Sequence, residues 1–213
     1  MPIEPLTINR PIPFGFHRDG TYAAAEMRQK CVAIVGTPGS GKTVVEQCFV
    51  AGLVRCPDAL VWPIDLSSGG LTNPWLNPWL DGDMAIPVLD WCAFTRDEAV
   101  TMTRVALEII DARRLAYRRL MRQHNTDKVP CSPAVPAIYI LLDEGKEATG
   151  ITGNPELIRN LITIADKGRA VAVRIIITGV RGTSETIPKE MMADIGARLA
   201  MRVAEDNELA HVL

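Results

Sequence analysis

The stretch Gly36-Thr37-Pro38-Gly39-Ser40-Gly41-Lys42-Thr43 decides the fold of this chain, because it follows the pattern G-x-x-x-x-G-K-[ST]. An apolar run of strand character, residues 31–35, precedes it. Residues 43–54 follow it with apolar side chains at helical spacing and no internal proline. A loop that joins a strand to a helix in this way directs successive backbone N–H groups towards one anion. The sequence therefore predicts a phosphate-binding loop.

Two side chains of this loop carry the chemistry expected of a nucleotide site. Lys42 is placed to reach the outer phosphates, and the hydroxyl of Thr43 is placed to ligate Mg²⁺. We therefore expect the chain to bind a nucleoside triphosphate together with Mg²⁺. The residues expected to bind the nucleotide are Gly36, Thr37, Pro38, Gly39, Ser40, Gly41, Lys42 and Thr43.

The composition of the 213 residues is that of one globular domain, with 47% hydrophobic and 23% charged residues. The sequence contains no run of about 20 apolar residues and no signal-peptide pattern, so we expect a soluble cytoplasmic protein without a transmembrane segment. The 5 cysteines and 3 histidines lack the spacing of a disulfide framework or a metal site. Because the formal net charge is −2, contact with nucleic acid requires a local basic patch.

Short apolar runs alternate with longer segments of helical periodicity along the rest of the chain. This alternation predicts an α/β fold, with a mainly parallel sheet flanked by helices. Residues 1–30 are rich in proline and turn signals, and we expect them to form a lead-in or hairpin. The expected strands are 31–35, 60–65, 85–89, 137–142, 171–178 and 197–203, and the expected helices are 43–54, 96–123, 155–167 and 189–195.

The segment 66–83 contains the tetrapeptide Asn-Pro-Trp-Leu twice in succession, at 73–76 and 77–80. Its prolines predict that no helix runs through it. We expect the tryptophans to anchor a long loop on the core, and a role at a subunit interface or pore is the alternative.

The longest expected helix, residues 96–123, carries an apolar stripe and a basic stripe. The apolar stripe predicts the face that packs on the core. The basic stripe is either a surface that follows the backbone of DNA or an ordinary solvated face. The apolar stripe consists of Val105, Ile109, Ala112, Ala116 and Leu120, and the basic stripe of Arg114, Arg118 and Arg122, with Arg113 and Arg119 beside it.

An acidic pair supplies the second half of the expected site. Residues 140–142 are apolar and lead into Asp143 and Glu144, about 100 residues after the phosphate loop. Asp143 is expected to hold Mg²⁺ through its water shell. Glu144 is expected to polarise or deprotonate the water that attacks the γ-phosphate.

Several stretches together resemble the FtsK/SpoIIIE family of hexameric DNA-translocating ATPases, which includes conjugative plasmid transfer proteins and the ATPases of type VII secretion. The resemblance covers residues 11–213 and implies a RecA-like P-loop NTPase core over residues 31–213. It also implies ATP and Mg²⁺ as cofactors, assembly into a homo-oligomeric, hexameric ring, and double-stranded DNA as a partner. The matching stretches are the phosphate loop, the helix that ends at 111–117, the acidic motif 140–144, and the runs 167–178, 187–188 and 197–204.

Two segments depart from the family pattern. Residues 65–70 read Asp-Leu-Ser-Ser-Gly-Gly where the family carries Asp-Pro-Lys-Gly, so the lysine is absent. Residues 178–182 read Thr-Gly-Val-Arg-Gly where the family carries Thr-Gln-Arg-Pro, so the glutamine that would sense the γ-phosphate is also absent. This departure concerns the rate and coupling of hydrolysis more than nucleotide binding. The candidates for the sensor and the arginine finger are Thr178, Arg169, Arg181, Arg198 and Arg202.

Three functions stay open on the sequence. The first is a ring-shaped motor that hydrolyses ATP, with Glu144 and Lys42 as catalytic residues, and moves double-stranded DNA in plasmid transfer, phage or chromosome handling. The second is a protein-export ATPase domain like those of type VII secretion. The third is a degenerate nucleotide-binding scaffold without turnover. The sequence ends soon after the last expected strand, so we expect either a minimal motor or a fragment of one.

Overall fold

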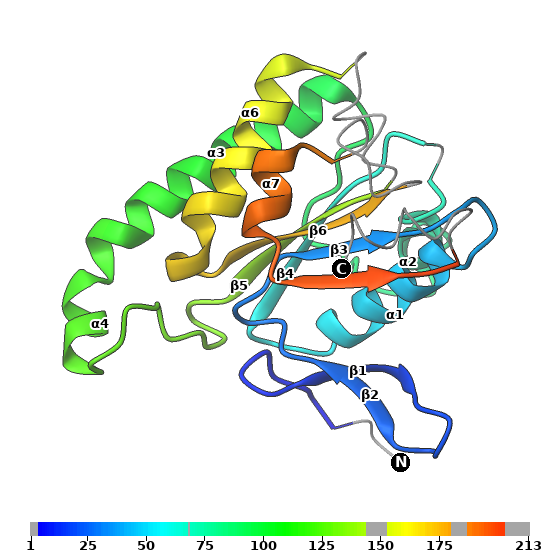
Figure 1. The fold of residues 1–213 in the computed structure, drawn as a ribbon, viewed down its shortest axis with the longest axis horizontal. Helices are drawn as coiled ribbons and strands as arrows, with labels where there is room; N and C mark the ends of the chain where they lie inside the picture. Colours follow the sequence, from blue (N-terminus) through cyan, green and yellow to red (C-terminus); the bar gives the residue numbers. More distant parts are fainter. Residues whose placement is uncertain (1–3, 68, 144–152, 180–186, 203–213) are drawn as a thin grey trace.

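The computed structural model describes residues 4–67, 69–143, 153–179 and 187–202 of the chain. Its centre is a sheet of five parallel strands in the order β4-β5-β6-β3-β7 (Figure 1). The expected α/β architecture is confirmed. The strands are β3 (Val32–Val35), β4 (Ala59–Ile64), β5 (Ala137–Leu142), β6 (Val173–Gly179) and β7 (Ala197–Ala200).

Helices cover both faces of this sheet, and strand β5 shows how the two layers are held. Its residues are all buried, and successive side chains point to opposite faces. Tyr139 packs in the same core as Phe49 of α1, whereas Ile140 packs in the same core as Ala106 of α3. One layer consists of α1 (Lys42–Leu53) with the hairpin of β1 (Ile12–Phe16) and β2 (Tyr22–Ala25), and the other of α3 (Arg96–Ala116), α6 (Pro155–Lys167) and α7 (Lys189–Asp194).

Capping residues and one proline account for several element boundaries. Thr95 and Glu98 form a reciprocal capping box at the start of α3. The side chain of Asn154 accepts hydrogen bonds from the first turn of α6. Pro63 lies within β4, which is an edge strand, as a proline inside a strand predicts.

The prediction that no helix runs through residues 66–83 is wrong. Helix α2 (Asn73–Leu80) includes both tetrapeptides. Pro74 lies in the first turn, where a backbone N–H has no partner within the helix, and Pro78 lies close to the end of this short element. The indole N–H of Trp75 donates a hydrogen bond to Gln47 of α1, so tertiary contact supports a helix that local propensity disfavours. Trp79 is 41% exposed and does not anchor the segment.

Three further expectations differ from the structure. Residues 85–89 form bends and no strand. An isolated parallel bridge between Ala93 and Ile64, the last residue of β4, is the pairing found in this part of the chain. The expected helix 96–123 is interrupted at Tyr117, whose ring packs against the core, and continues as α4 (Arg118–Gln123). The buried face of α3 is displaced by about one position from the predicted stripe, of which Val105 and Ile109 are only partly buried against the core. The buried residues are Ala99, Val100, Met102, Thr103, Ala106 and Ile110.

Two strands differ in extent from their predictions. A turn of 3-10 helix, η1 (Gly168–Val171), occupies the start of the expected strand 171–178, and Ala172 follows it with φ 59°, so β6 begins at Val173. β7 ends at Ala200, before the expected limit at residue 203, which lies outside the described residues. None of the helices in the described ranges is both long and apolar enough to span a membrane.

Candidate functional site

The phosphate loop lies at the edge of the sheet where the parallel strands end. Its first residue follows β3. Gly179 ends the adjacent strand β6, and Asp143 follows β5, the strand on the other side of β6. The N–H of Gly36 donates to the carbonyl of Gly179 at 3.2 Å. The N–H and hydroxyl of Thr37 both donate to the carbonyl of Arg202, at 2.9 and 3.0 Å. The loop is therefore fixed to the strands on either side of β3.

Glycines give the loop its shape. Gly39 has φ 74° and Gly41 has φ 94°, values that side chains with a Cβ atom rarely adopt. A Cβ atom on Gly36 would lie 2.6 Å from Oγ of Ser40 and 2.7 Å from Cβ of Met201. The backbone therefore favours glycine at all three positions, two of which, Gly36 and Gly41, are fixed by the motif.

The lysine of the motif lies over its own loop. Nζ of Lys42 donates to the carbonyl oxygens of Gly36 and Thr37, at 2.8 and 3.2 Å. Helix α1 begins at Lys42, and the side chain of Thr43 is exposed in its first turn. Oγ of Ser40 is buried and has no hydrogen-bond partner among the described residues. The N-terminus of α1, a cation and an unpaired hydroxyl thus gather at one point, which suits an anionic ligand.

Asp143 and Thr178, both selected from the sequence, meet at this site. Asp143 is 7% exposed and Thr178 is fully buried at the end of the adjacent strand β6. The hydroxyl of Thr178 donates a hydrogen bond of 3.0 Å to Oδ1 of Asp143. This bond fixes the orientation of one carboxylate oxygen, which is what a cation ligand or a sensor of its occupancy requires.

Sequence reasoning missed Glu46. This residue belongs to the buried stripe of α1 that includes Phe49, Val50 and Leu53, and it is fully buried. Burial raises the pKa of the Glu46 carboxyl well above its ordinary value, and the nearby carboxylates of Asp143 and Asp65 raise it further. The sequence does contain a signal. Positions 46, 49, 50 and 53 fall on one face of a helix, and position 46 carries a glutamate where the other three carry apolar residues.

Asp65 has a structural task in the loop after β4. Its two carboxylate oxygens accept hydrogen bonds from four backbone N–H groups and from the hydroxyl of Thr72. The side chain is 2% exposed. This acid therefore organises the segment that departs from the family pattern, and its hydrogen-bonding capacity is used there.

The remaining candidates lie apart from one another. Arg202 is exposed and lies next to the phosphate loop through its carbonyl group. Arg198 is exposed on the edge strand β7 and donates to the carbonyl of Met192 at 3.0 Å. Arg169 is in η1, at the opposite end of the sheet from the phosphate loop. Glu144 and Arg181 lie outside the described residues.

The donor set fits a nucleotide with Mg²⁺. Thr43 offers a hydroxyl oxygen and Asp143 a carboxylate oxygen, and oxygen ligands are those that Mg²⁺ selects. Glu46 adds a second carboxylate that accepts no hydrogen bond from the described part of the chain. These hydroxyl and carboxylate oxygens would suit a cation with its water shell.

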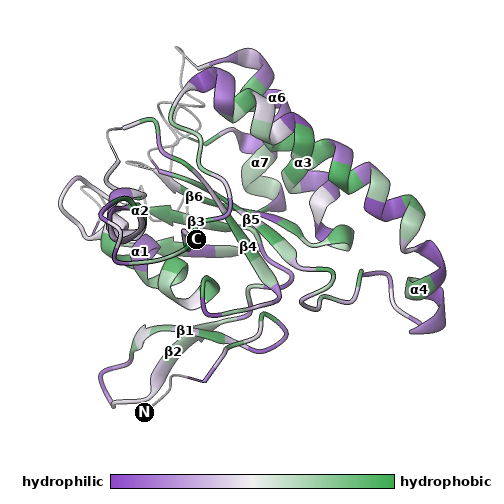
Figure 2. Cartoon of the chain, turned by 180° about the vertical axis from the view of Figure 1, so that it is seen from behind, coloured by the Kyte–Doolittle hydropathy of each residue, from purple (hydrophilic) through white to green (hydrophobic). Residues whose placement is uncertain are grey.

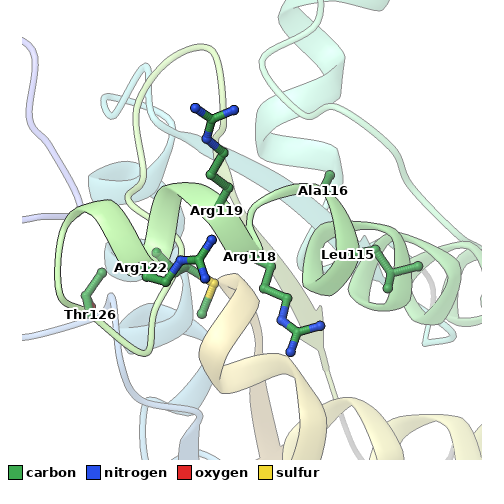
Figure 3. A pocket seen from close by; sticks show the side chains of 7 residues that line it. Leu115, Ala116, Arg118, Arg119, Arg122 and Thr126 are labelled. Carbon is green, nitrogen blue, oxygen red and sulfur yellow. The ribbon is translucent and has the colours of Figure 1, made fainter.

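A basic surface lies far from this edge, on α4 (Figure 1). A cavity of about 640 Å³ is lined by Arg118, Arg119 and Arg122 together with neighbouring residues of the α3–α4 corner. Figure 3 shows the guanidinium groups of Arg118 and Arg119 extending in different directions. The charges are therefore spread over the surface and do not converge on one point. In Figure 2 α4 is largely hydrophilic, whereas the strands of the sheet are largely hydrophobic.

No protein family model matches the sequence, and no curated protein matches it. Solved structures do match its fold. The chain is similar to the pCW3 conjugation coupling protein TcpA, in its monomer form with ATPγS, at 14% identity and a TM-score of 0.72, over 96% of this chain and 57% of that one. It is also similar to EssC (ATPases 2 and 3) from Geobacillus thermodenitrificans, at 14% identity and a TM-score of 0.74. This match covers 100% of this chain and 40% of that one.

A third similar structure is the cytoplasmic domain of the Thermomonospora curvata type VII secretion ATPase EccC, at 18% identity and a TM-score of 0.71. The match covers 100% of this chain and 26% of that one, so the chain spans less than two thirds of each of these three structures. Likeness at such identities establishes the fold. The expected RecA-like fold is confirmed.

Proposed function

We propose that this chain is an ATP-binding and ATP-hydrolysing motor domain. The observation that carries the proposal is the meeting of the phosphate loop with the bonded pair Asp143 and Thr178 at one edge of the sheet. On binding ATP, the ammonium of Lys42 leaves the loop carbonyls for the outer phosphates. Thr43 and Asp143 would hold the Mg²⁺, which would supply positive charge to offset that of the phosphates.

Glu144 is the proposed general base. It follows Asp143 directly in the sequence, two residues after the last residue of β5, and a carboxylate there is suited to take the proton from the attacking water. Thr178 is the proposed sensor, since its hydroxyl is already bonded to the carboxylate of Asp143 and it directly precedes the position of the family glutamine.

We further propose that the motor works on double-stranded DNA as a homo-oligomeric ring. The similarity in fold to a conjugation coupling protein supports DNA as the partner. The surface of α4 favours the same partner, because Arg118, Arg119 and Arg122 are exposed and none forms an ion pair with an acid in the described part of the chain. Spread cations suit the regularly spaced phosphates of a duplex.

Protein export is the second candidate, and the similarity in fold to two secretion ATPases supports it. Measuring ATP hydrolysis with and without linear duplex DNA separates the candidates. Stimulation by DNA supports the translocase, turnover that is indifferent to DNA supports the export motor, and binding without turnover supports the scaffold. Lys42→Ala serves as the control for contaminating ATPases.

The DNA surface has its own test. Arg118→Ala/Arg122→Ala should lower duplex affinity and reduce the slope of log affinity against log salt by about 0.9 for each phosphate that the protein no longer neutralises. Arg18→Ala, in the exposed β1–β2 turn, is the matched control. An unchanged slope in the double variant would place the DNA-binding surface elsewhere.

A further inference from the structure

Glu46 is a carboxyl group without a hydrogen-bond donor in the middle of a core. Its exposed fraction is 0%, and neither Oε1 nor Oε2 accepts a hydrogen bond from the described residues. Burying a carboxyl group without a partner is costly. The other buried positions of α1 are filled by apolar residues or glycine, so packing alone does not account for an acid here.

The neighbours of Glu46 are acids. Its carboxyl group lies near Asp143, at the end of β5, and near Asp65, at the end of β4. Asp65 is saturated by hydrogen bonds from its own loop, whereas Oδ1 of Asp143 accepts a bond from Thr178. Glu46 and Asp143 thus form a pair of carboxyl groups with capacity for further donors.

Glu46 lies on the same helix, α1, as the motif residues Lys42 and Thr43. It follows Lys42 by four residues and Thr43 by three, and residues at these spacings share one side of a helix. The lysine, the threonine and the glutamate therefore line the same side of α1, facing the ends of the central strands. A ligand held by the first two residues lies on the side to which the third belongs.

We propose that Glu46 is a carboxylate of the Mg²⁺ site, and that it accepts hydrogen bonds, together with Asp143, from the water molecules around the Mg²⁺ that accompanies the nucleotide. The inference rests on the proposed nucleotide site and adds to it a residue that the phosphate-loop motif does not contain. The water molecules supply the donors that Glu46 lacks, and the cation offsets the repulsion between the two acids.

If Glu46 has this role, its substitution changes the affinity for Mg²⁺ but not the affinity for nucleotide without Mg²⁺. If Glu46 only packs in the core, its substitution changes both. Removing the charge of Glu46 weakens the hold on Mg²⁺, and loss of such outer partners lowers metal affinity by about 10–100-fold. Without Mg²⁺ the cation that Glu46 is proposed to serve is absent, and glutamine has nearly the size of glutamate, so affinity for nucleotide alone should change little. A structural defect in α1 would weaken both.

The experiment measures binding of a fluorescent ATP analogue to the full chain, first in excess EDTA and then during titration with Mg²⁺. For Glu46→Gln we expect the Mg²⁺ concentration at half-effect to rise by about tenfold or more, with affinity in EDTA little changed. Glu108→Gln, at an exposed position of α3, is the matched control and should follow the wild type. Mn²⁺ titration followed by electron paramagnetic resonance gives the metal affinity directly.

Three results would overturn the inference. One is an unchanged Mg²⁺ requirement in Glu46→Gln, and another is an equal loss of affinity with and without Mg²⁺. The third applies where Glu46→Gln does not fold. Glu46→Asp then serves instead, because it keeps the carboxylate on a side chain that is shorter by one methylene group. A wild-type Mg²⁺ requirement in Glu46→Asp would contradict the role. Failure of the wild type to bind the analogue under any condition would instead contradict the proposed nucleotide site.

Discussion

The hydroxyl of Thr178 and Oδ1 of Asp143 are joined by a hydrogen bond of 3.0 Å between the ends of two adjacent strands. Both side chains are buried, so water does not replace the donor if the threonine is removed. A hydrogen bond to a charged group contributes about 1.5–3 kcal/mol. The carboxylate proposed to hold Mg²⁺ therefore depends on a residue of the neighbouring strand for its orientation.

Replacing this donor tests that dependence. Thr178→Val keeps the shape of the side chain and removes the hydroxyl, so we expect turnover to fall by about tenfold and the Mg²⁺ requirement to rise, since loss of an outer-shell partner costs this much or more. Thr178→Ser keeps the donor and should retain most of the activity. Steady-state hydrolysis at several Mg²⁺ concentrations is the measurement, and equal activity in the two variants would argue against a role for the bond.

Lys42→Ala should abolish binding or hydrolysis of ATP, because it removes the cation that the phosphate loop offers to the outer phosphates. Nucleotide raises the melting temperature of a protein that binds it in the folded state. We therefore expect millimolar Mg·ATP to stabilise the wild type in a thermal melt and to leave Lys42→Ala unshifted. A folded variant with near-normal hydrolysis would contradict the assignment of the loop.

Glu144→Gln should separate binding from turnover. The amide keeps the size of the side chain and loses the base, so ATP stays bound while hydrolysis falls by about 10²-fold or more. Trapped ATP is expected to hold subunits together, which sedimentation with and without ATP would detect. If hydrolysis survives this change and instead falls in Asp65→Asn, the catalytic acid belongs to the end of β4.

The raised pKa of Glu46 predicts how the free protein responds to pH. In the unfolded chain this carboxyl group loses its proton near its ordinary pKa of 4.5, whereas in the folded chain burial and the neighbouring acids Asp143 and Asp65 keep the proton bound to higher pH. The free energy of unfolding therefore falls as pH rises above that value, by up to about 1.4 kcal/mol per pH unit, until the group ionises in the folded state.

Glu46→Gln removes this source of pH dependence. In urea unfolding with EDTA and without nucleotide, we expect the variant to gain stability relative to the wild type as the pH rises above the ordinary pKa of the carboxyl group, 4.5. With Mg·ATP present the order should reverse, since the wild type then gains more binding free energy. Parallel stability curves for the two proteins would show that Glu46 does not change its protonation on unfolding.

The sequence was sufficient for the parallel sheet because one of its interior strands, β5, is a continuous apolar run. In residues 137–142 every side chain is buried, and such a run admits few other interpretations. Helix α2 was not predictable in this way, since proline rules describe local backbone cost, and its support comes from the contact of Trp75 with Gln47, which is distant in sequence. The same limit applies to the buried stripe of α3, because two apolar stripes have similar periodicity and packing decides between them.

The sequence likewise identified some residues of the candidate site and missed others. Lys42, Thr43 and Asp143 were found because each belongs to a motif with a fixed spacing. Glu46 was missed because the motif ends before it, and a single glutamate in a helix is ordinary until its burial is known. The pairing of Thr178 with Asp143 required the strand order, which places β6 beside β5.

The double hydrogen bond from Thr37 to the carbonyl of Arg202 gives the site a mechanical connection. Arg202 lies two residues after the end of β7, and its carbonyl group holds Thr37, the second residue of the phosphate loop. A pull on this segment reaches the loop through two short bonds, without passing through the hydrophobic core. Thermodynamic linkage makes the connection reciprocal, so a change in the position of the loop is also felt at Arg202. In a motor, these two hydrogen bonds would let a change in the bound nucleotide move the backbone at Arg202 directly.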